Sequence, residues 1–198
     1  MTLTTQLRSL LNDMRPGASK PTVKWWHGAL FLGAVSVIGR ISTGSIKDNK
    51  EQDEFYEKEK TPPWSPPAWL FGVAWPLNNI ALTWGGLRLL NEGKTLKNRN
   101  ALLALQGVHW LIFMTFGWAY FRKKSPVLAL AWTQADTLVA LSSLTLAYRD
   151  DRKLAWAYLP LSLWTSFASS VAWYQALYNP DPYLETEPLA EELPELVS

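Results

Sequence analysis

The sequence predicts an all-α membrane protein, built as a bundle of five transmembrane helices. Five long apolar stretches divide most of the 198 residues, and the segments that join the last four are short, which forces neighbouring helices to run antiparallel. The chain also holds 12 tryptophans, and indole groups favour the interface between a bilayer and water. The mean hydropathy of -0.07 averages these stretches with charged segments.

The chain divides into three parts. Residues 1–22 are polar with leucines at helical spacing, which predicts either an amphipathic helix at the membrane surface or a disordered arm. Residues 23–180 form the membrane domain. Residues 181–198 carry acidic side chains and no lysine or arginine, which predicts a disordered acidic tail.

The first span is predicted over residues 25–41, with Trp25 and Trp26 at one interface and Arg40 at the other. A charged, solvated loop follows over 42–61, and we expect it to cover whatever lies between the helices.

A proline-rich corner at Pro62, Pro63, Pro66 and Pro67 opens the second span. Each proline fixes its own φ and disfavours helix at the preceding residue, so residues 61–66 cannot be helical, whereas Pro67 can open a helix. From Ala68 to Leu90 the only ionisable side chain is Arg88, and about 24 residues suffice to cross a bilayer core.

The remaining spans are predicted over residues 101–121, 126–148 and 154–178. Five spans place the termini on opposite sides of the membrane. Lysine and arginine number ten on the amino-terminal side against seven on the other, so the positive-inside rule predicts a cytoplasmic amino terminus.

Several classes of function are disfavoured. The chain has no cysteine, which excludes disulfides, thiolate zinc sites and cysteine nucleophiles. It has two histidines and lacks zinc-protease, phosphate-loop and nucleophile-elbow motifs, so we predict neither catalytic residues of these types nor a metal site. The net charge of +2 comes with no basic face for nucleic acid.

The proline corner is part of a longer motif that resembles the TspO/MBR family, the tryptophan-rich sensory proteins related to the mitochondrial translocator protein. That family's loop reads tyrosine, a short spacer, then Pro-x-Trp-x-Pro-Pro-x-Trp. The matching residues are Phe55-Tyr56, then Pro62-Pro63-Trp64-Ser65-Pro66-Pro67-Ala68-Trp69-Leu70-Phe71-Gly72 and Trp75. Leu159-Pro160, Trp164 and Ser166-Phe167-Ala168 are similar to the family's fifth-helix pattern, and Ser125-Pro126 fits its turn between helices three and four. The resemblance covers roughly residues 28–180 and implies the family's five-helix fold.

The resemblance also implies a cavity for porphyrin, haem or sterol-like ligands. Flat aromatic walls suit a flat macrocycle, whereas the alternative for the same side chains is bundle packing and interface anchoring. The implied wall residues are Trp64, Trp69, Trp75, Asn79, Trp118, Phe121, Trp164, Phe167 and Ala168.

The chain departs from the family at polar positions that face the ligand. Asn79 stands where the family has a tyrosine, and apolar or aromatic side chains occupy the other positions, which are Phe113, Trp132, Leu161 and Ala172. The cavity is therefore either filled by side chains or shaped for another ligand. The sterol-recognition pattern needs a base after its tyrosine, and none follows Tyr174.

His109 and Asp136 form a second candidate site that owes nothing to the resemblance. Each lies roughly 13 residues from the turn at residues 123–124, so both lie about 20 Å down adjacent helices and can meet inside the bundle. A buried carboxylate has to be protonated or paired. The pair is either a ligand or proton site or a structural hydrogen bond, and His109 alone is also a potential ligand for the metal of a haem or chlorophyll-type pigment.

Three classes of function stay open. The first binds or passes a tetrapyrrole or a similar hydrophobic ligand, with a regulatory role. The second is a non-catalytic accessory subunit of a larger respiratory or photosynthetic membrane complex. The third is an enzyme, because some family members are linked to light-dependent porphyrin breakdown. Small residues at Gly85, Gly86, Ala168, Ala172 and Ala176 predict close helix approach, within the chain or in a homodimer.

Overall fold

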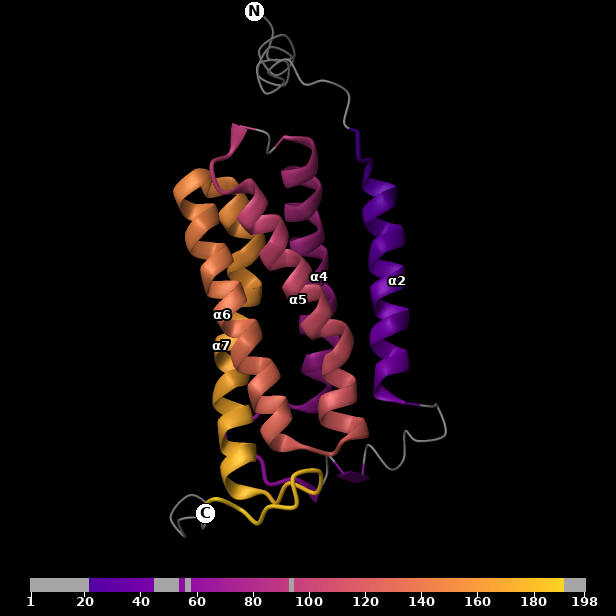
Figure 1. The fold of residues 1–198 in the computed structure, drawn as a ribbon, viewed down its shortest axis with the longest axis vertical. Coiled ribbons are helices and arrows are strands. Elements are labelled where there is room, and N and C mark those ends of the chain that lie inside the picture. The colour runs from indigo at the N-terminus through magenta and orange to yellow at the C-terminus, as the bar shows by residue number, and fades with distance from the viewer. Residues whose placement is uncertain (1–21, 45–53, 56–57, 93–94, 191–198) are drawn as a thin grey trace, which may run out of the picture.

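The computed structural model describes residues 22–44, 54–55, 58–92 and 95–190. Five long helices account for most of them (Figure 1), and no β-strand forms among these residues. The helices are α2 (Trp25–Thr43), α4 (Ala68–Asn91), α5 (Arg99–Gly117), α6 (Pro126–Asp150) and α7 (Arg152–Tyr178). A π-helical turn, η3 (Trp118–Arg122), continues α5. The predicted five-helix fold is confirmed, and each helical segment contains the apolar stretch from which it was predicted.

Helix starts follow local chemistry. Pro67 is the extended N-cap residue, with φ -60° and ψ 146°, and α4 begins at Ala68, one residue after the start that the proline corner predicts. Ser125 caps α6 by accepting a hydrogen bond from the Leu128 backbone N–H at 3.0 Å, and Pro126 occupies the first helical position. The Asp151 side chain caps α7 in the same way through the Lys153 N–H.

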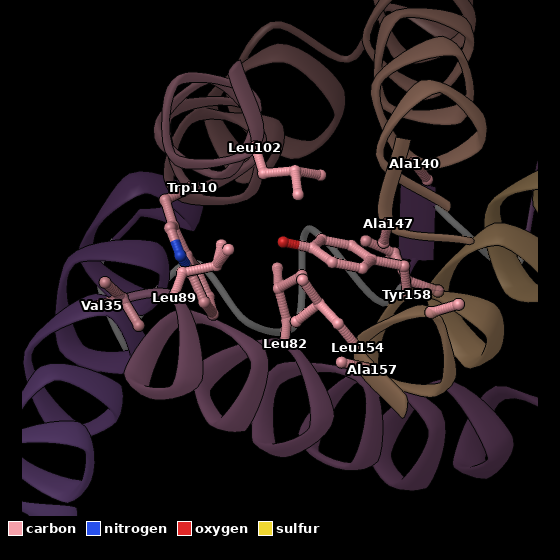
Figure 2. Close-up of a cluster of buried hydrophobic side chains, with 12 residues drawn as sticks. Val35, Leu82, Leu89, Leu102, Trp110, Ala140, Ala147, Leu154, Ala157 and Tyr158 are labelled. Atoms are coloured by element: carbon pink, nitrogen blue, oxygen red, sulfur yellow. The ribbon is translucent and has the colours of Figure 1, made fainter. Parts of the chain in front are cut away.

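The helices form a ring in the order α2, α5, α6, α7, α4, and α4 also contacts α5 across it. Helices α6 and α7 lie side by side along their length (Figure 1). The apolar core gathers where α4, α5 and α7 meet, around Leu82, Leu102 and Tyr158 (Figure 2). Gln106 Nε2 donates to the Leu82 carbonyl at 3.0 Å and to the Tyr158 hydroxyl at 3.2 Å, so one amide joins the three helices.

The predicted small-residue faces lie against neighbours within this chain. A Cβ at Gly85 would come 2.9 Å from the Cβ of Ala157, so the glycine lets α4 approach α7. Ala172 and Ala176 are buried, and Ala168 is half-buried.

Helix α2 is the outer member of the bundle. Only Gly28 and Val35 of its 19 residues are buried, and a Cβ at Gly28 would lie 2.9 Å from the Thr83 side chain of α4. Large apolar side chains of α2, α4 and α7 point away from the core, among them Leu30, Val37, Ile41, Leu77, Ile80 and Leu163.

The predicted disordered tail starts too early at residue 181. Residues 181–190 are described, and they fold back over the end of the bundle. Asp181 is buried, and its carboxylate accepts hydrogen bonds from the Ser125 hydroxyl and the Val127 N–H on α6 and from two N–H groups of its own turn, those of Tyr183 and Leu184. These four donors compensate the burial of the charge. The predictions for residues 1–21 and 191–198, and most of the charged loop, lie outside the described residues.

Candidate ligand-binding site

Five aromatic side chains from α4, α5 and α7 meet where these helices face one another, and we call them the inner aromatic cluster: Phe71, Trp75, Phe113, Trp164 and Phe167. The first four are half-buried, and Phe167 is 37% exposed. The Trp164 ring centroid lies 5.3 Å from that of Phe71, 6.3 Å from that of Trp75 and 6.1 Å from that of Phe167. Trp75 also approaches Phe113 of α5 at 5.7 Å. Residues 71 and 75, and likewise 164 and 167, are spaced to share one helix face. The cluster thus offers several ring faces and edges at one depth.

Trp64 lies at the rim of this site. A turn closed by the Ser65 N–H and the Pro62 carbonyl holds the corner, and the Trp64 ring is 6.0 Å from Tyr174. The indole N–H donates to the Ser170 hydroxyl at 3.2 Å, and 47% of the residue stays exposed. Ser170 is three residues beyond Phe167 and six beyond Trp164, so Trp64 contacts α7 about 4.5 Å from Phe167 and about 9 Å from Trp164 along the helix.

The structure does not bring all the predicted wall residues together. Trp69 is 67% exposed and points away from the bundle. Trp118 contacts Trp132, with centroids 6.3 Å apart, and Phe121 contacts Tyr120 at 4.9 Å. These rings form a separate group around η3, without a ring contact to the inner aromatic cluster in the described part of the chain.

Several buried polar atoms lack a hydrogen-bond partner, and two of their residues belong to or border the inner aromatic cluster: Trp164 is a member, and the His109 ring lies 6.4 Å from Phe113. Within the described helices these atoms are Asn78 Nδ2, Asn79 Oδ1, Thr83 Oγ1, His109 Nε2 and Trp164 Nε1. An unsatisfied buried polar group costs about 1–3 kcal/mol, so most buried polar groups in proteins have partners. Polar atoms gathered beside aromatic rings are the groups that fix a ligand's orientation in a mainly apolar site. Asn78 and Thr83 are not among the residues predicted for the site, although uncharged polar residues inside an apolar span are a usable signal.

Neighbouring contacts place Asn78, Asn79 and His109 at one level. Two contacts align α4 with α5: Trp75 lies against Phe113, and the Leu82 carbonyl accepts a hydrogen bond from Gln106. The two asparagines lie between the α4 members of these contacts, and His109 lies between the α5 members. The polar groups therefore lie one turn deeper than the aromatic cluster.

His109 and Asp136 are in direct contact. His109 Nδ1 lies 2.6 Å from Asp136 Oδ1, and the two residues are 1% and 3% exposed. The carboxylate fixes the orientation of the imidazole and leaves Nε2 as its unpartnered nitrogen. The imidazole ring is also 6.4 Å from Phe113, so the pair borders the inner aromatic cluster.

The model of the TspO/MBR family matches residues 29–177, a range that includes the inner aromatic cluster, the polar atoms beside it and the His109–Asp136 pair. The chain belongs to the TspO/MBR family. It is also 24% identical over 157 residues to the tryptophan-rich protein TspO of Chlorobaculum tepidum, a stretch that covers 77% of this chain and 95% of that protein.

The departures from the TspO/MBR pattern have different structural outcomes. Phe113 joins the inner aromatic cluster, whereas Trp132 belongs to the group around η3 and donates its indole N–H to Thr115 at 2.9 Å. Leu161 and Ala172 are buried among the helices, and Asn79 keeps an unpartnered oxygen. Tyr56 of the family motif lies outside the described residues.

The segment before the TspO/MBR proline corner is fastened to the end of α7. The Lys60 N–H donates to Asn179 Oδ1 at 2.7 Å, and Asn179 Nδ2 donates back to the Lys60 carbonyl at 3.0 Å. Glu59 is half-buried beside this contact, with an unpartnered Oε2. Burial and the nearby negative charge of Asp181 raise the pKa of Glu59 to about 7.

Glu59 is expected to make the stability of the fold depend on pH. Between its ordinary pKa of 4.5 and about 7, the folded protein holds a proton that the unfolded chain has released. Protonated Glu59 therefore contributes its full stabilisation of the folded state below pH 4.5, and this contribution is lost as pH rises through about 7. We expect the thermal midpoint in detergent to fall between pH 5 and 8, and to fall less in Glu59→Gln. An equal fall in both proteins would contradict this assignment.

Proposed function

We propose that this TspO/MBR protein crosses a membrane five times and binds or passes a tetrapyrrole, or a similar hydrophobic ligand, with a regulatory role. The observation that carries the proposal is the inner aromatic cluster, together with the unpartnered polar atoms at its inner end. Ring faces supply dispersion and stacking to a flat macrocycle, and polar atoms such as Trp164 Nε1 and Asn79 Oδ1 supply hydrogen bonds to its edge.

Length and composition support the membrane topology. The segments Arg99–Arg122 and Pro126–Asp150 are long and apolar enough to cross a bilayer. Helices α2, α4 and α7 are 19, 24 and 27 residues long and expose large apolar side chains. Even the shortest spans about 28 Å, close to the thickness of a bilayer core.

Single-cysteine labelling tests the topology, because the natural chain has no cysteine and serves as the blank. With a cytoplasmic amino terminus, Lys58 lies outside and Lys97 inside. A membrane-impermeant maleimide should label Lys58→Cys in right-side-out vesicles, and Lys97→Cys only after permeabilisation. The reverse pattern would overturn the orientation, and labelling of both without permeabilisation would overturn the crossing by α4.

Titration with protoporphyrin IX tests the ligand site. Trp164→Ala removes the central ring of the cluster and should weaken binding at least about tenfold, a difference of about 1.4 kcal/mol. Trp164→Phe keeps a ring but removes the N–H, and should weaken binding roughly fivefold. Trp173→Phe is the matched control, because this α7 tryptophan is 50% exposed and lies outside the cluster. Unchanged affinity in both Trp164 variants would remove the site.

A second candidate is a non-catalytic subunit of a larger membrane complex. It is favoured by apolar side chains at positions where the family has polar ones, such as Phe113 and buried Leu161. Purification in mild detergent distinguishes the candidates: a large complex without pigment supports the subunit, whereas an isolated chain or homodimer with bound tetrapyrrole counts against it.

A further inference from the structure

A groove of about 540 Å³ is lined by residues of α6 and α7. These residues lie at the bundle end where the two helices join, and Figure 1 shows this end of the two helices. The arginine end of the groove lies about 18 Å along α7 from Trp164 of the inner aromatic cluster, and its deep end at Leu159 about 7.5 Å. Its lining combines two arginines, two exposed aromatic rings and an apolar floor. The lining residues are Leu144, Thr145, Tyr148, Arg149, Arg152, Ala155, Trp156 and Leu159.

The groove changes character along its length. Arg149 and Arg152 flank the connection between the helices. Leu144 on α6 lies about 8 Å deeper and Leu159 on α7 about 10 Å deeper, at 1.5 Å per residue. Trp156 is 70% exposed between these levels. This order matches the layers of a bilayer. The arginines would lie at the level of the headgroups, the aromatic rings at the interface and the leucines in the hydrocarbon.

The carboxylates next to the two arginines are engaged elsewhere. Asp150 accepts hydrogen bonds from the backbone N–H and the side-chain amide of Asn98 at 2.7 and 2.9 Å. Asp151 pairs with Arg88 of α4, with Nη2 at 2.8 Å. Within the described residues neither Arg149 nor Arg152 pairs with a carboxylate, and the Arg152 guanidinium lies 5.5 Å from the centre of the Tyr148 ring. The groove therefore presents two guanidinium groups that form no ion pair within the described residues.

We propose that this groove binds one anionic phospholipid. The phosphate would lie between Arg149 and Arg152, because guanidinium groups bind phosphate through paired, charge-assisted hydrogen bonds. An acyl chain would follow Leu144, Ala155 and Leu159 toward the bilayer centre. Basic sites between helix ends are typical of such lipids, and the apolar floor favours a lipid over a free anion. The proposal requires that α6 and α7 cross the membrane, but it does not require that the aromatic cluster bind a tetrapyrrole.

Lipid binding to the full chain in detergent tests the proposal, measured by native mass spectrometry and by the shift in thermal midpoint. Phosphatidylglycerol should bind and stabilise more than phosphatidylcholine with the same acyl chains. Arg149→Gln/Arg152→Gln should weaken phosphatidylglycerol binding at least tenfold and abolish the preference. The control Lys97→Gln/Lys153→Gln removes the same charge at the same end of the bundle but outside the groove, and should bind as the natural chain does.

Further arms separate the alternatives. Inorganic phosphate should give no stabilisation at matched concentration, and an equal effect would overturn the lipid in favour of a soluble anion. Equal binding of both lipids, or equal loss in the two double variants, would overturn the site. The protoporphyrin affinity of Arg149→Gln/Arg152→Gln should match that of the natural chain, because both arginines are exposed and distant from the cluster. If the natural chain binds no tetrapyrrole, circular dichroism provides the check on folding. The lipid measurements then still test the groove independently of the proposed tetrapyrrole site.

Discussion

Replacing Asp136 with alanine is expected to lower the stability of the bundle by about 3–5 kcal/mol, because removal of one member of a buried polar pair leaves the other unsatisfied. His109 is 1% exposed and, among the described residues, has Asp136 as its hydrogen-bond partner. By the usual scaling for a chain of this size, the thermal midpoint in detergent should fall by about 6–20 °C.

A double replacement identifies the cause of that loss. His109→Leu/Asp136→Leu removes both polar groups and should recover at least half of the lost midpoint, because replacing both partners with apolar side chains is often close to neutral. Asp136→Asn retains an acceptor and should lie between the natural chain and Asp136→Ala. A double variant less stable than Asp136→Ala would show that the pair stabilises the bundle by more than supplying each polar group with a hydrogen-bond partner.

Replacing Asp181 with alanine is expected to release the described turn at 181–190 from the bundle and to cost about 3 kcal/mol. Hydrogen bonds to a charged group contribute about 1.5–3 kcal/mol each, and they are not additive. The carboxylate also faces the amino-terminal end of α6, through the Val127 N–H at 3.1 Å, where the helix dipole favours a negative charge. The measurement is the thermal midpoint at pH 6, which should fall by about 6–12 °C.

Asp181→Asn is the matched variant, because it keeps an oxygen acceptor but loses the charge. It should lose less stability than Asp181→Ala. Both variants should also lower the pKa of Glu59, since one of its two causes is removed, and so weaken the fall of the midpoint between pH 5 and 8. An unchanged midpoint in Asp181→Ala would show that the turn contributes nothing to the folded state.

The helices could be predicted because their signals are local. These signals are the uninterrupted apolar stretches, the proline corner before Ala68 and the Ser125-Pro126 start of α6. Each is contained in one continuous segment of the chain. The meeting of His109 and Asp136 could also be predicted, because a tight turn fixes the register of two antiparallel helices. The order of the tail could not, because Asp181 is held by Ser125 and Val127, more than 50 residues earlier.

Only some of the predicted wall residues meet in the structure, because residue type does not fix the direction of a side chain around a helix. Trp69 lies two positions before Phe71, and residues so spaced do not share a helix face, so one points outward when the other points inward. Trp118 and Phe121 fall in the π-helical turn η3, whose pitch rotates them out of the α-helical register of α5. Whether the side chains of Asn78 and Thr83 have hydrogen-bond partners depends on the helices packed around them, and the sequence does not contain that information.

The sparse packing of α2 bears on how the chain is assembled. The helices that α2 contacts, α4 and α5, come later in the sequence, so a growing chain makes α2 well before its neighbours exist. In the five-span topology, this first segment would enter the bilayer alone and wait there, surrounded by lipid, until residues beyond 68 have been translated. Its many exposed apolar side chains suit contact with lipid during that period. The packing of α2 onto α4 and α5 through Gly28 and Val35 would be a late event in biogenesis.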